Sequence, residues 1–258
     1  MLAGHRRQEI AALVRRRGSV RVADLVERFG VSDMTVRRDL EVLAEQAVLL
    51  KVHGGATAIG APVTDEPGFE AKSLVQRAEK EAIAARAAAL VAPGTAVAVS
   101  AGTTTWALAR ELLEIPRLTV VTNSLRVGEM FHRRKRADQE VVLTGGVPTP
   151  SDALVGPVAV AAIGSLNVDL LLLGVHGMST HAGFTTPNLL EAETNRALAA
   201  TARRLVVLAD HTKWGVIGVG TIAALEDADV LVTDQGLGEA ERALLAERVG
   251  DLVIAPSP

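Results

Sequence analysis

The run SAGTTT at 100–105 follows an apolar stretch and places Gly102 before Thr103, Thr104 and Thr105. A glycine lets a ligand approach the backbone closely, and the threonine hydroxyls stand beside the free amides of a helix expected to begin here. This combination suits a phosphate group. The run lacks the Gly-Lys-Ser/Thr ending of a Walker A loop. A threonine-rich helix start can also be purely structural, so the run alone is a weak signal.

Further polar residues follow other apolar runs of the chain. They are Thr122-Asn123-Ser124, Gly145-Gly146, Gly174-Val175-His176-Gly177 and Asp210-His211-Thr212-Lys213, with Glu191 and Glu193 on the helix after Phe184–Pro187. Each has a plain alternative: Asn123 as a helix cap, His176 as a loop residue, Glu191 as solvated helix surface. Their joint position at successive strand ends favours one shared binding site.

The elements that must position these residues are alternating strands and helices. Short aliphatic or β-branched runs predict strands at 95–100, 118–122, 140–144, 169–175, 204–209 and 229–233. Helical segments are expected at 78–91, 105–113, 124–134, 156–166, 188–202 and 237–248. Buried strands alternating with helices indicate an α/β, Rossmann-like domain with a mostly parallel sheet covered on both faces. Ligands of such sheets bind at the carboxyl ends of the strands.

The N-terminal part predicts a different fold, an all-α domain with a small β-wing. Helices are expected at 6–18 and 23–30, and a third begins after Ser32, whose hydroxyl can cap it. The packing residues recur at helical spacing: Ile10, Leu13 and Val14, then Leu25, Val26 and Phe29, then Val36, Leu40 and Leu43. Residues 47–57, with a turn at Gly54-Gly55, are typical of the wing of a winged helix-turn-helix.

One face of the third helix remains free to meet a partner. A winged helix-turn-helix inserts this helix into the major groove, N-terminal residues first. Arg37 and Arg38 can reach phosphate or guanine, Thr35 phosphate, and Asp33 and Met34 base edges. Which arginine reads a base stays open, and two adjacent arginines can also form a merely solvated face. The predicted DNA-binding residues are Ser32, Asp33, Met34, Thr35, Arg37 and Arg38, with Lys51 and His53 of the wing.

The N-terminal part and the rest of the chain differ in net charge. Residues 1–56 carry ten basic and seven acidic residues, a net charge of +3, and the remaining seventeen basic and twenty-three acidic residues give −6. We therefore expect only the N-terminal part to meet a polyanion. The basic run HRRKR at 132–136 lies in the acidic part, and we interpret it as a solvated helix end. The expected domains are 1–57, a linker at 58–77, and 78–258.

Composition excludes several classes of site. The chain has no cysteine, which excludes disulfides, thiolate-bound zinc and thiol catalysis, and which fits a cytoplasmic location. The N-terminus shows no signal-peptide pattern, and the uncharged run at 170–175 is far too short to span a bilayer, so no membrane partner is expected. We expect no cofactor and no metal.

The N-terminal residues also resemble a known family, the DeoR-type bacterial transcription regulators. The matching positions are Arg6, Ile10, Val14, Ser32, Thr35, Val36, Arg37, Arg38, Asp39 and Leu40, together with VHGGA at 52–56. The chain departs from the family pattern at Ala47, where glycine is usual, and at Leu50, where a second basic wing residue is common.

The resemblance continues along the chain, because the sensor domain of that family looks like ribose-5-phosphate isomerase and related sugar-phosphate enzymes. It implies that Gly102–Thr105 with Asn123 and Ser124 hold a phosphate, and that Lys213 supplies a cation. Asp210 and Glu191 would then bind sugar hydroxyls. The Gly145-Gly146 pair matches the family, so Gly146 joins the expected site. The family usually has an acid at Ser100, and His176 stands at a variable position that would help to select the effector.

Three functions are compatible with these features. The first is a repressor of carbohydrate genes that binds a double-stranded DNA operator as a homo-oligomer, dimer or tetramer, and is released by a phosphorylated sugar. The second is a sugar-phosphate isomerase or deaminase with an appended DNA-binding domain, since Glu191, Asp210 and Lys213 could serve catalysis. The third is a DNA-binding protein whose larger domain only oligomerises. We favour the first, since a DNA-binding domain has no evident use on a metabolic enzyme.

Overall fold

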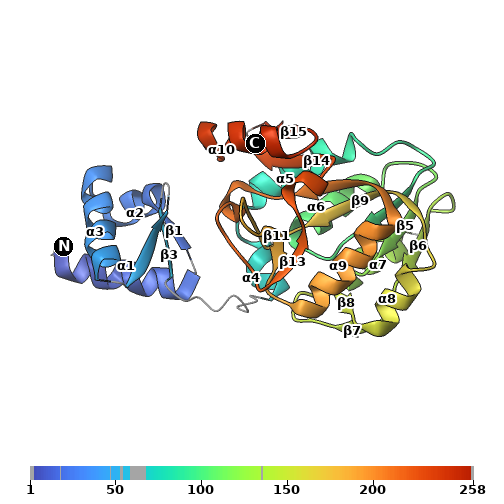
Figure 1. Cartoon of the computed structure of the whole chain (residues 1–258), viewed down its shortest axis with the longest axis horizontal. Helices are drawn as coiled ribbons and strands as arrows, with labels where there is room; N and C mark the ends of the chain where they lie inside the picture. The colour runs from blue at the N-terminus through green and yellow to red at the C-terminus, as the bar shows by residue number, and fades with distance from the viewer. Residues whose placement is uncertain are drawn as a thin grey trace. The chain divides into compact units, whose positions relative to one another are not determined.

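The computed structural model describes residues 3–17, 19–46, 48–52, 55–58, 68–134 and 136–256 of the 258-residue chain. The chain divides into two compact units, Met1–Asp65 and Glu66–Pro258. Each unit has a hydrophobic core of its own. Figure 1 labels the elements of the first unit from α1 to β3 and those of the second from α4 to β15. We describe the two units separately.

The first unit is a winged helix-turn-helix, as the sequence predicts. Its elements are α1 (Ala3–Arg17), β1 (Ser19–Arg21), α2 (Val22–Phe29), α3 (Asp33–Glu45), β2 (Leu49–Val52) and β3 (Gly55–Ala58). The strands form an antiparallel sheet in the order β1-β3-β2. The turn between α2 and α3 passes through Gly30 at φ +62°, a left-handed conformation that glycine adopts without steric cost.

The core of the first unit consists of the apolar stripes that helical spacing predicts. Ile10, Val14, Leu25, Val36 and Leu40 are each at most 1% exposed. Because these residues hold α3 against α1 and α2, the opposite face of α3 remains on the surface.

The second unit is built on a parallel sheet of seven strands. They are β4 (Ala96–Val99), β5 (Thr119–Thr122), β6 (Glu140–Leu143), β9 (Val168–Gly174), β12 (Ala202–Leu208), β14 (Val230–Asp234) and β15 (Leu252–Ala255). Their order is β15-β14-β12-β9-β4-β5-β6, with every pairing parallel. Six of them were expected from sequence. The short C-terminal run LVIA, now β15, was missed.

Helices cover both faces of this sheet, and the side chains of each strand alternate between the two cores. Leu170 and Leu172 of β9 pack on one side, with α5 (Arg77–Ala88), α6 (Thr103–Leu112) and α7 (Leu125–Arg134). Leu171 and Leu173 pack on the other, with α8 (Pro157–Ile163), α9 (Leu189–Thr201) and α10 (Glu239–Arg248). Strands buried on both faces are apolar throughout, which explains the continuous LLLL run.

Several smaller elements were not expected. β10 (Gly177–Ser179), β11 (Gly183–Thr186) and β13 (Gly220–Ala223) form an antiparallel sheet, and β7 (Val147–Pro148) pairs with β8 (Leu154–Val155). Two 3-10 turns, η1 (His211–Lys213) and η2 (Leu225–Asp227), follow β12 and β13. α4 (Phe69–Ser73) lies inside the range expected to be linker and belongs to the second unit.

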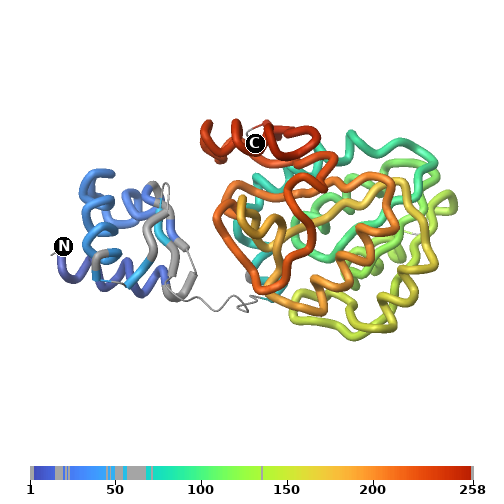
Figure 2. Tube along the Cα trace, in the orientation of Figure 1, coloured from blue at the N-terminus to red at the C-terminus, as the bar shows by residue number. Residues whose placement is uncertain are grey.

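The course of the chain brings distant segments of the second unit together. α5, near its start, packs beside β14 and β15 at its end, as the trace in Figure 2 shows. Among the described residues, no helix combines the length and apolarity needed to cross a membrane.

Candidate functional site

The start of α3 is fixed by a side-chain cap. Ser32 precedes the helix in extended conformation, and its Oγ accepts a hydrogen bond from the Thr35 amide at 3.3 Å. The hydroxyls of Ser32 and Thr35 also lie 2.9 Å apart. These two residues therefore order the first turn of α3, where the backbone amides of a helix are free.

The exposed residues of α3 differ in how they are held. Arg37 is tied to Asp33 one turn earlier, with Nε 2.5 Å from Oδ1, and this hydrogen bond raises the pKa of Arg37. Met34 is 80% exposed. Within the part of the chain that the structure describes, exposed Arg38 has no ion pair or hydrogen bond from its side chain. Arg38 is thus the arginine of α3 whose guanidinium is not engaged within the described part of the protein.

The wing packs on the core of the first unit through Leu49 and Ala56. Lys51 lies in β2 opposite Ala56 of β3, and the side-chain position of Lys51 is not described. His53 lies outside the described residues. The predicted contacts of both residues stay predictions.

In the second unit, the 100–105 run forms the N-terminus of α6. Gly102 stands before the helix at φ +150°, and a Cβ there would lie 3.2 Å from Thr105 Oγ1. The first intrahelical hydrogen bond of α6 runs from the Trp106 amide to the Gly102 carbonyl. The amides of Thr103, Thr104 and Thr105 therefore have no acceptor within the helix. Thr105 donates its hydroxyl to the Gly102 carbonyl at 3.0 Å. This end of α6 presents amides and a positive dipole end to an anion.

Asn123 and Ser124 act inside the protein. Asn123 Oδ1 accepts from the Ala101 amide at 2.9 Å, and Nδ2 donates to the Leu154 carbonyl at 3.3 Å. Ser124 Oγ accepts from the Val127 amide at the start of α7. Both side chains are 1% exposed, so they position the loops after β4 and β5.

Ser100 and Gly146 are also used in packing. Ser100 Oγ accepts from the Gly174 amide at 3.0 Å and so ties the ends of β4 and β9 together. Gly146, at φ +116°, passes so close to β8 that a Cβ would lie 2.5 Å from the Val155 carbonyl oxygen. His176 is partly exposed after β9, and its amide donates to the Thr185 carbonyl at 3.0 Å.

Glu191 is surrounded by hydroxyl groups. Its Oε1 accepts from Thr149 at 2.7 Å and from Ser151, and its Oε2 accepts from Thr186 at 3.1 Å. The side chain is partly exposed in the first turn of α9, which Asn188 caps. The carboxylate thus holds the loop at 149–151 beside β11.

Asp210 and Lys213 lie together after β12. Asp210 is 1% exposed, and its Oδ1 accepts from the Thr212 amide and hydroxyl. Its Oδ2 is buried without a hydrogen-bond partner among the described residues. The ammonium of Lys213, partly exposed, has no ion pair in the described part of the chain. A buried acceptor without a donor is uncommon, so Asp210 Oδ2 is a candidate acceptor for a ligand hydroxyl.

A residue not expected from sequence, Lys80 of α5, completes this group. It is 5% exposed, and its Nζ donates to the carbonyls of Lys72 and Val75, each at 2.6 Å. Burial lowers the pKa of Lys80 to about 8, the nearby negative charge of Asp210 opposes this effect, and Lys213 adds to it. The signal was present in the sequence, because Lys80 shares a helix face with the buried Ile83, Ala84 and Ala87.

A pocket of about 140 Å³ connects Lys80 with the start of α6. Its lining includes Ser73, Lys80, Thr103 and Trp106. His211, in the turn after β12, joins the end of β14 to the residue before α5. Its Nδ1 lies 2.7 Å from Asp234 Oδ1, and its Nε2 lies 3.4 Å from Gln76 Nε2. Burial alone would raise the pKa of Asp234, but the hydrogen bonds from His211 outweigh it and lower that pKa.

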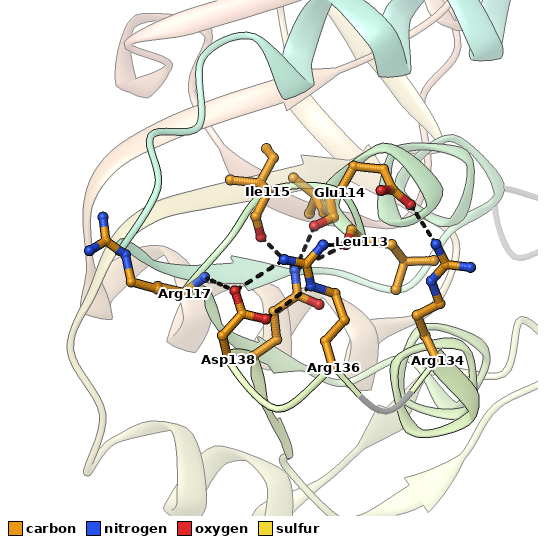
Figure 3. Close-up of polar contacts among 9 residues, drawn as sticks. Leu113, Glu114, Ile115, Arg117, Arg134, Arg136 and Asp138 are labelled. Atoms are coloured by element: carbon orange, nitrogen blue, oxygen red, sulfur yellow. Dashed lines mark hydrogen bonds and ion pairs between the residues drawn. The ribbon is translucent and has the colours of Figure 1, made fainter.

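The basic run at 132–136 is paired within the protein. Arg134 reaches Glu114 at 3.0 Å, and Arg136 binds Asp138 and the Leu113 carbonyl (Figure 3). The hydrogen bond to Asp138 raises the pKa of Arg136. Arg133 pairs with Glu129 at 2.6 Å, and Lys135 lies outside the described residues. These pairings support the interpretation as a helix end.

The arrangement is suited to binding an anionic polyol. Helix amides and lysines can hold a negative group, and carboxylate oxygens can accept from hydroxyls. In the described ranges, no group of three histidines and carboxylates is placed to hold a metal ion.

Comparisons with known proteins cover most of the chain. The family model described as "DeoR-like helix-turn-helix domain" matches residues 6–61, and that described as "DeoR C terminal sensor domain" matches residues 75–235. The HTH-type transcriptional regulator YgbI of Escherichia coli (strain K12) is 34% identical over 98% of this chain and 98% of its own. The Glycerol-3-phosphate regulon repressor of the same organism is 32% identical, over 89% of this chain and 90% of its own.

A solved structure is similar at a much lower level. Ribose 5-phosphate isomerase A from Methanocaldococcus jannaschii is 16% identical, with a TM-score of 0.39, over 52% of this chain and 53% of that chain. A likeness this distant carries no argument about function.

Proposed function

Because the chain belongs to the DeoR family of transcriptional regulators, we propose that it is a repressor of carbohydrate genes. Its N-terminal unit binds a double-stranded DNA operator, and its C-terminal unit releases that operator on binding a phosphorylated sugar. The observation that supports the effector class is the group formed by the α6 N-terminus, Lys80, Lys213 and the unpaired Asp210 oxygen.

The phosphate of the effector binds at the start of α6. The amides of Thr103–Thr105 supply donors, and Lys213 supplies a cation. Asp210 accepts a sugar hydroxyl through its unpaired oxygen, and His176, partly exposed after β9, contributes to the choice of sugar. Asn123 and Ser124 support the site by positioning its loops, and Gly146 does so by its close packing on β8.

DNA recognition rests on α3. Arg38 contacts phosphate or a guanine edge, and Met34, which is 80% exposed, reaches base edges. One unit of this size gives little specificity, so two or more copies bind repeated half-sites as a homo-oligomer, a dimer or tetramer. The effector acts by binding more tightly to a state that spaces these units unfavourably on DNA.

The second unit acts as a sensor and not as an enzyme. The curated relatives are named as transcriptional regulators, and one name includes glycerol 3-phosphate, a phosphorylated polyol. Glu191, the carboxylate that could serve as a base, already accepts hydrogen bonds from three hydroxyls. We assign Glu191 to holding the loop that borders the effector site.

The proposal is tested with the full chain and fluorescently labelled DNA from the upstream region of its own gene. Anisotropy is measured with glucose 6-phosphate, fructose 6-phosphate, ribose 5-phosphate, glycerol 3-phosphate and inorganic phosphate. We expect one sugar phosphate to release the DNA. Tight binding that no compound disturbs would argue for a second unit that only oligomerises, and turnover of a compound would argue for an enzyme.

A pair of lysine and arginine variants locates the site. Lys213→Met should weaken the response to the releasing compound about tenfold, as expected for the loss of a charged hydrogen bond. Arg203→Met removes a charge near the opposite end of β12, where Arg203 lies 3.6 Å from Asp169, and should respond as wild type does. Equal responses of the two variants would place the phosphate elsewhere.

A further inference from the structure

α4 is held on the second unit by aromatic and charged contacts. Phe69 packs edge-to-face on Trp106 of α6 at 5.7 Å between ring centroids. Arg126 of α7 lies over the Phe69 ring at 4.6 Å and pairs with Glu70 at 2.8 Å. Arg126 also binds Asp152, at 2.7 Å, next to the loop that Glu191 holds. α4 is therefore bound to elements that border the effector site.

The side chain of Lys80 binds the backbone at the end of α4. Its Nζ donates to the carbonyls of Lys72 and Val75 at 2.6 Å each, and the Lys72 carbonyl also accepts from the Val75 amide at 3.3 Å. The side chains around these carbonyls add little, because Leu74 is 80% and Val75 57% exposed. The Lys80 ammonium thus ties residues 72–75 to α5.

The same ammonium belongs to the anion site. Lys80 and Thr103 of the α6 N-terminus line one pocket, and Lys80 is electrostatically coupled to Asp210 and Lys213. An ammonium has three hydrogens, two of which point at the α4 carbonyls. An anion beside Thr103 attracts the ammonium away from those carbonyls, since a charged acceptor forms the stronger hydrogen bond.

We propose that Lys80 is shared between the effector anion and the end of α4, so that effector binding and attachment of α4 compete. The inference rests on the proposed function. α4 directly follows the boundary between the two units at 65/66, so its release alters the segment that carries the DNA-binding unit. Competition is reciprocal: loosening α4 must strengthen effector binding by the same factor by which the effector loosens α4.

The reciprocal effect is tested with Phe69→Ala, which removes the contact with Trp106 and leaves Lys80 intact. In the full chain we expect the releasing sugar phosphate to bind about fivefold more tightly, a modest coupling, and the DNA to bind more weakly. Val75→Ala is the matched control, because this exposed side chain lies on the same segment but does not line the pocket. It should behave as wild type. A purely structural role of Lys80 gives unchanged or weaker effector affinity in Phe69→Ala, which would overturn the proposal.

Hydrogen exchange of the full chain tests the attachment directly. Effector should speed exchange in residues 68–76 several-fold, with no comparable change across β4, β9 and β12. In Lys80→Met this segment should exchange quickly without effector, and effector should not change its exchange rate. Slower exchange on effector binding, or an unchanged segment in Lys80→Met, would overturn the proposal. If Lys80→Met does not fold, the wild-type and Phe69→Ala measurements decide.

The two proposals fail in different ways. If no compound of the panel binds, the proposed function and the competition fall together. If a sugar phosphate binds and releases DNA while residues 68–76 do not respond and Phe69→Ala keeps its affinity, the proposed function stands and only the competition falls.

Discussion

Arg6 Nε lies 2.6 Å from Asp39 Oδ2, an ion pair that joins α1 to α3 with both side chains at most 9% exposed. Arg7 approaches the other carboxylate oxygen at 3.6 Å. Asp39 follows Arg37 and Arg38 in the chain, so the pair fixes the angle at which α3 presents its arginines. Arg6 and Asp39, two positions of the family signature, therefore have a structural role. Arg38, next to Asp39 in the chain, is exposed.

Removing the carboxylate charge leaves Arg6 buried without its partner. We expect Asp39→Asn to destabilise the first unit by about 3 kcal/mol, the range for a broken buried pair. Both tryptophans, Trp106 and Trp214, lie in the second unit, so their fluorescence in urea reports that unit alone. Far-UV circular dichroism reports helices of both units and should show an added early transition.

The matched control is Asp33→Asn, which breaks an exposed pair with Arg37. We expect the urea transition to stay close to that of wild type, because exposed ion pairs contribute little. Equal urea transitions for Asp39→Asn and wild type would show that the buried pair does not hold α3.

The second prediction concerns the two adjacent arginines. Arg38→Ala should weaken operator binding by about 1–3 kcal/mol, the range of one good base or phosphate contact. Arg37→Ala should weaken operator binding less, because the Arg37 guanidinium is already hydrogen-bonded to Asp33. Anisotropy against operator and scrambled DNA separates base reading from phosphate binding.

Arg133→Ala serves as the control, because Arg133 pairs with Glu129 in the second unit. It should bind the operator as wild type does. A larger loss of operator affinity in Arg37→Ala than in Arg38→Ala would mean that the Arg37–Asp33 pair breaks when the protein binds DNA.

Regular periodicity made much of the fold predictable. The apolar residues of α3 recur at helical spacing, and the runs of β9 and β12 have the length of buried strands, so both elements were found. β10, β11 and β13 were missed because their sequences, GMS, GFTT and GTIA, contain no aliphatic run longer than two residues. β15 was missed although it is as long as β4, β5 and β6.

Sequence predicts the strand ends at which the candidate residues lie, but not what each side chain contacts. Strand ends converge in a parallel sheet, which brings Gly102, His176 and Asp210 to one edge. Sequence does not reveal that the Asn123 side chain is hydrogen-bonded to the Ala101 amide and the Leu154 carbonyl. Lys80 was overlooked although it shares a helix face with buried residues, because its hydrogen-bond partners are backbone carbonyls that the sequence pattern does not reveal.

The third prediction separates backbone strain from phosphate binding. Gly102→Ala places a Cβ at φ +150°, 3.2 Å from Thr105 Oγ1, and so distorts the start of α6. We expect loss of the response to sugar phosphate with operator affinity retained. Gly94→Ala is strained as well, at φ +82°, but has open space around it and should keep the response. Loss of response in both variants would point to general destabilisation.

The fourth prediction is a pH dependence that arises from Lys80. Burial lowers the pKa of Lys80 from 10.5 to about 8. An anion binds the protonated ammonium, so effector affinity should be full below pH 8 and fall, by up to about tenfold per pH unit, as pH rises through 8. A phosphate monoester loses its second proton near pH 6, so the effector itself does not titrate in this window.

The stability of the second unit should change in the opposite direction. Between pH 8 and 10.5 the unfolded chain binds more protons at this lysine than the folded one, so the contribution of Lys80 to stability rises with pH there. Calorimetric titration with the releasing sugar phosphate from pH 6.5 to 9 measures the affinity. Lys80→Met should bind weakly and without this dependence. A wild-type affinity that is flat across pH 8 would show that the ammonium of Lys80 does not take part in anion binding.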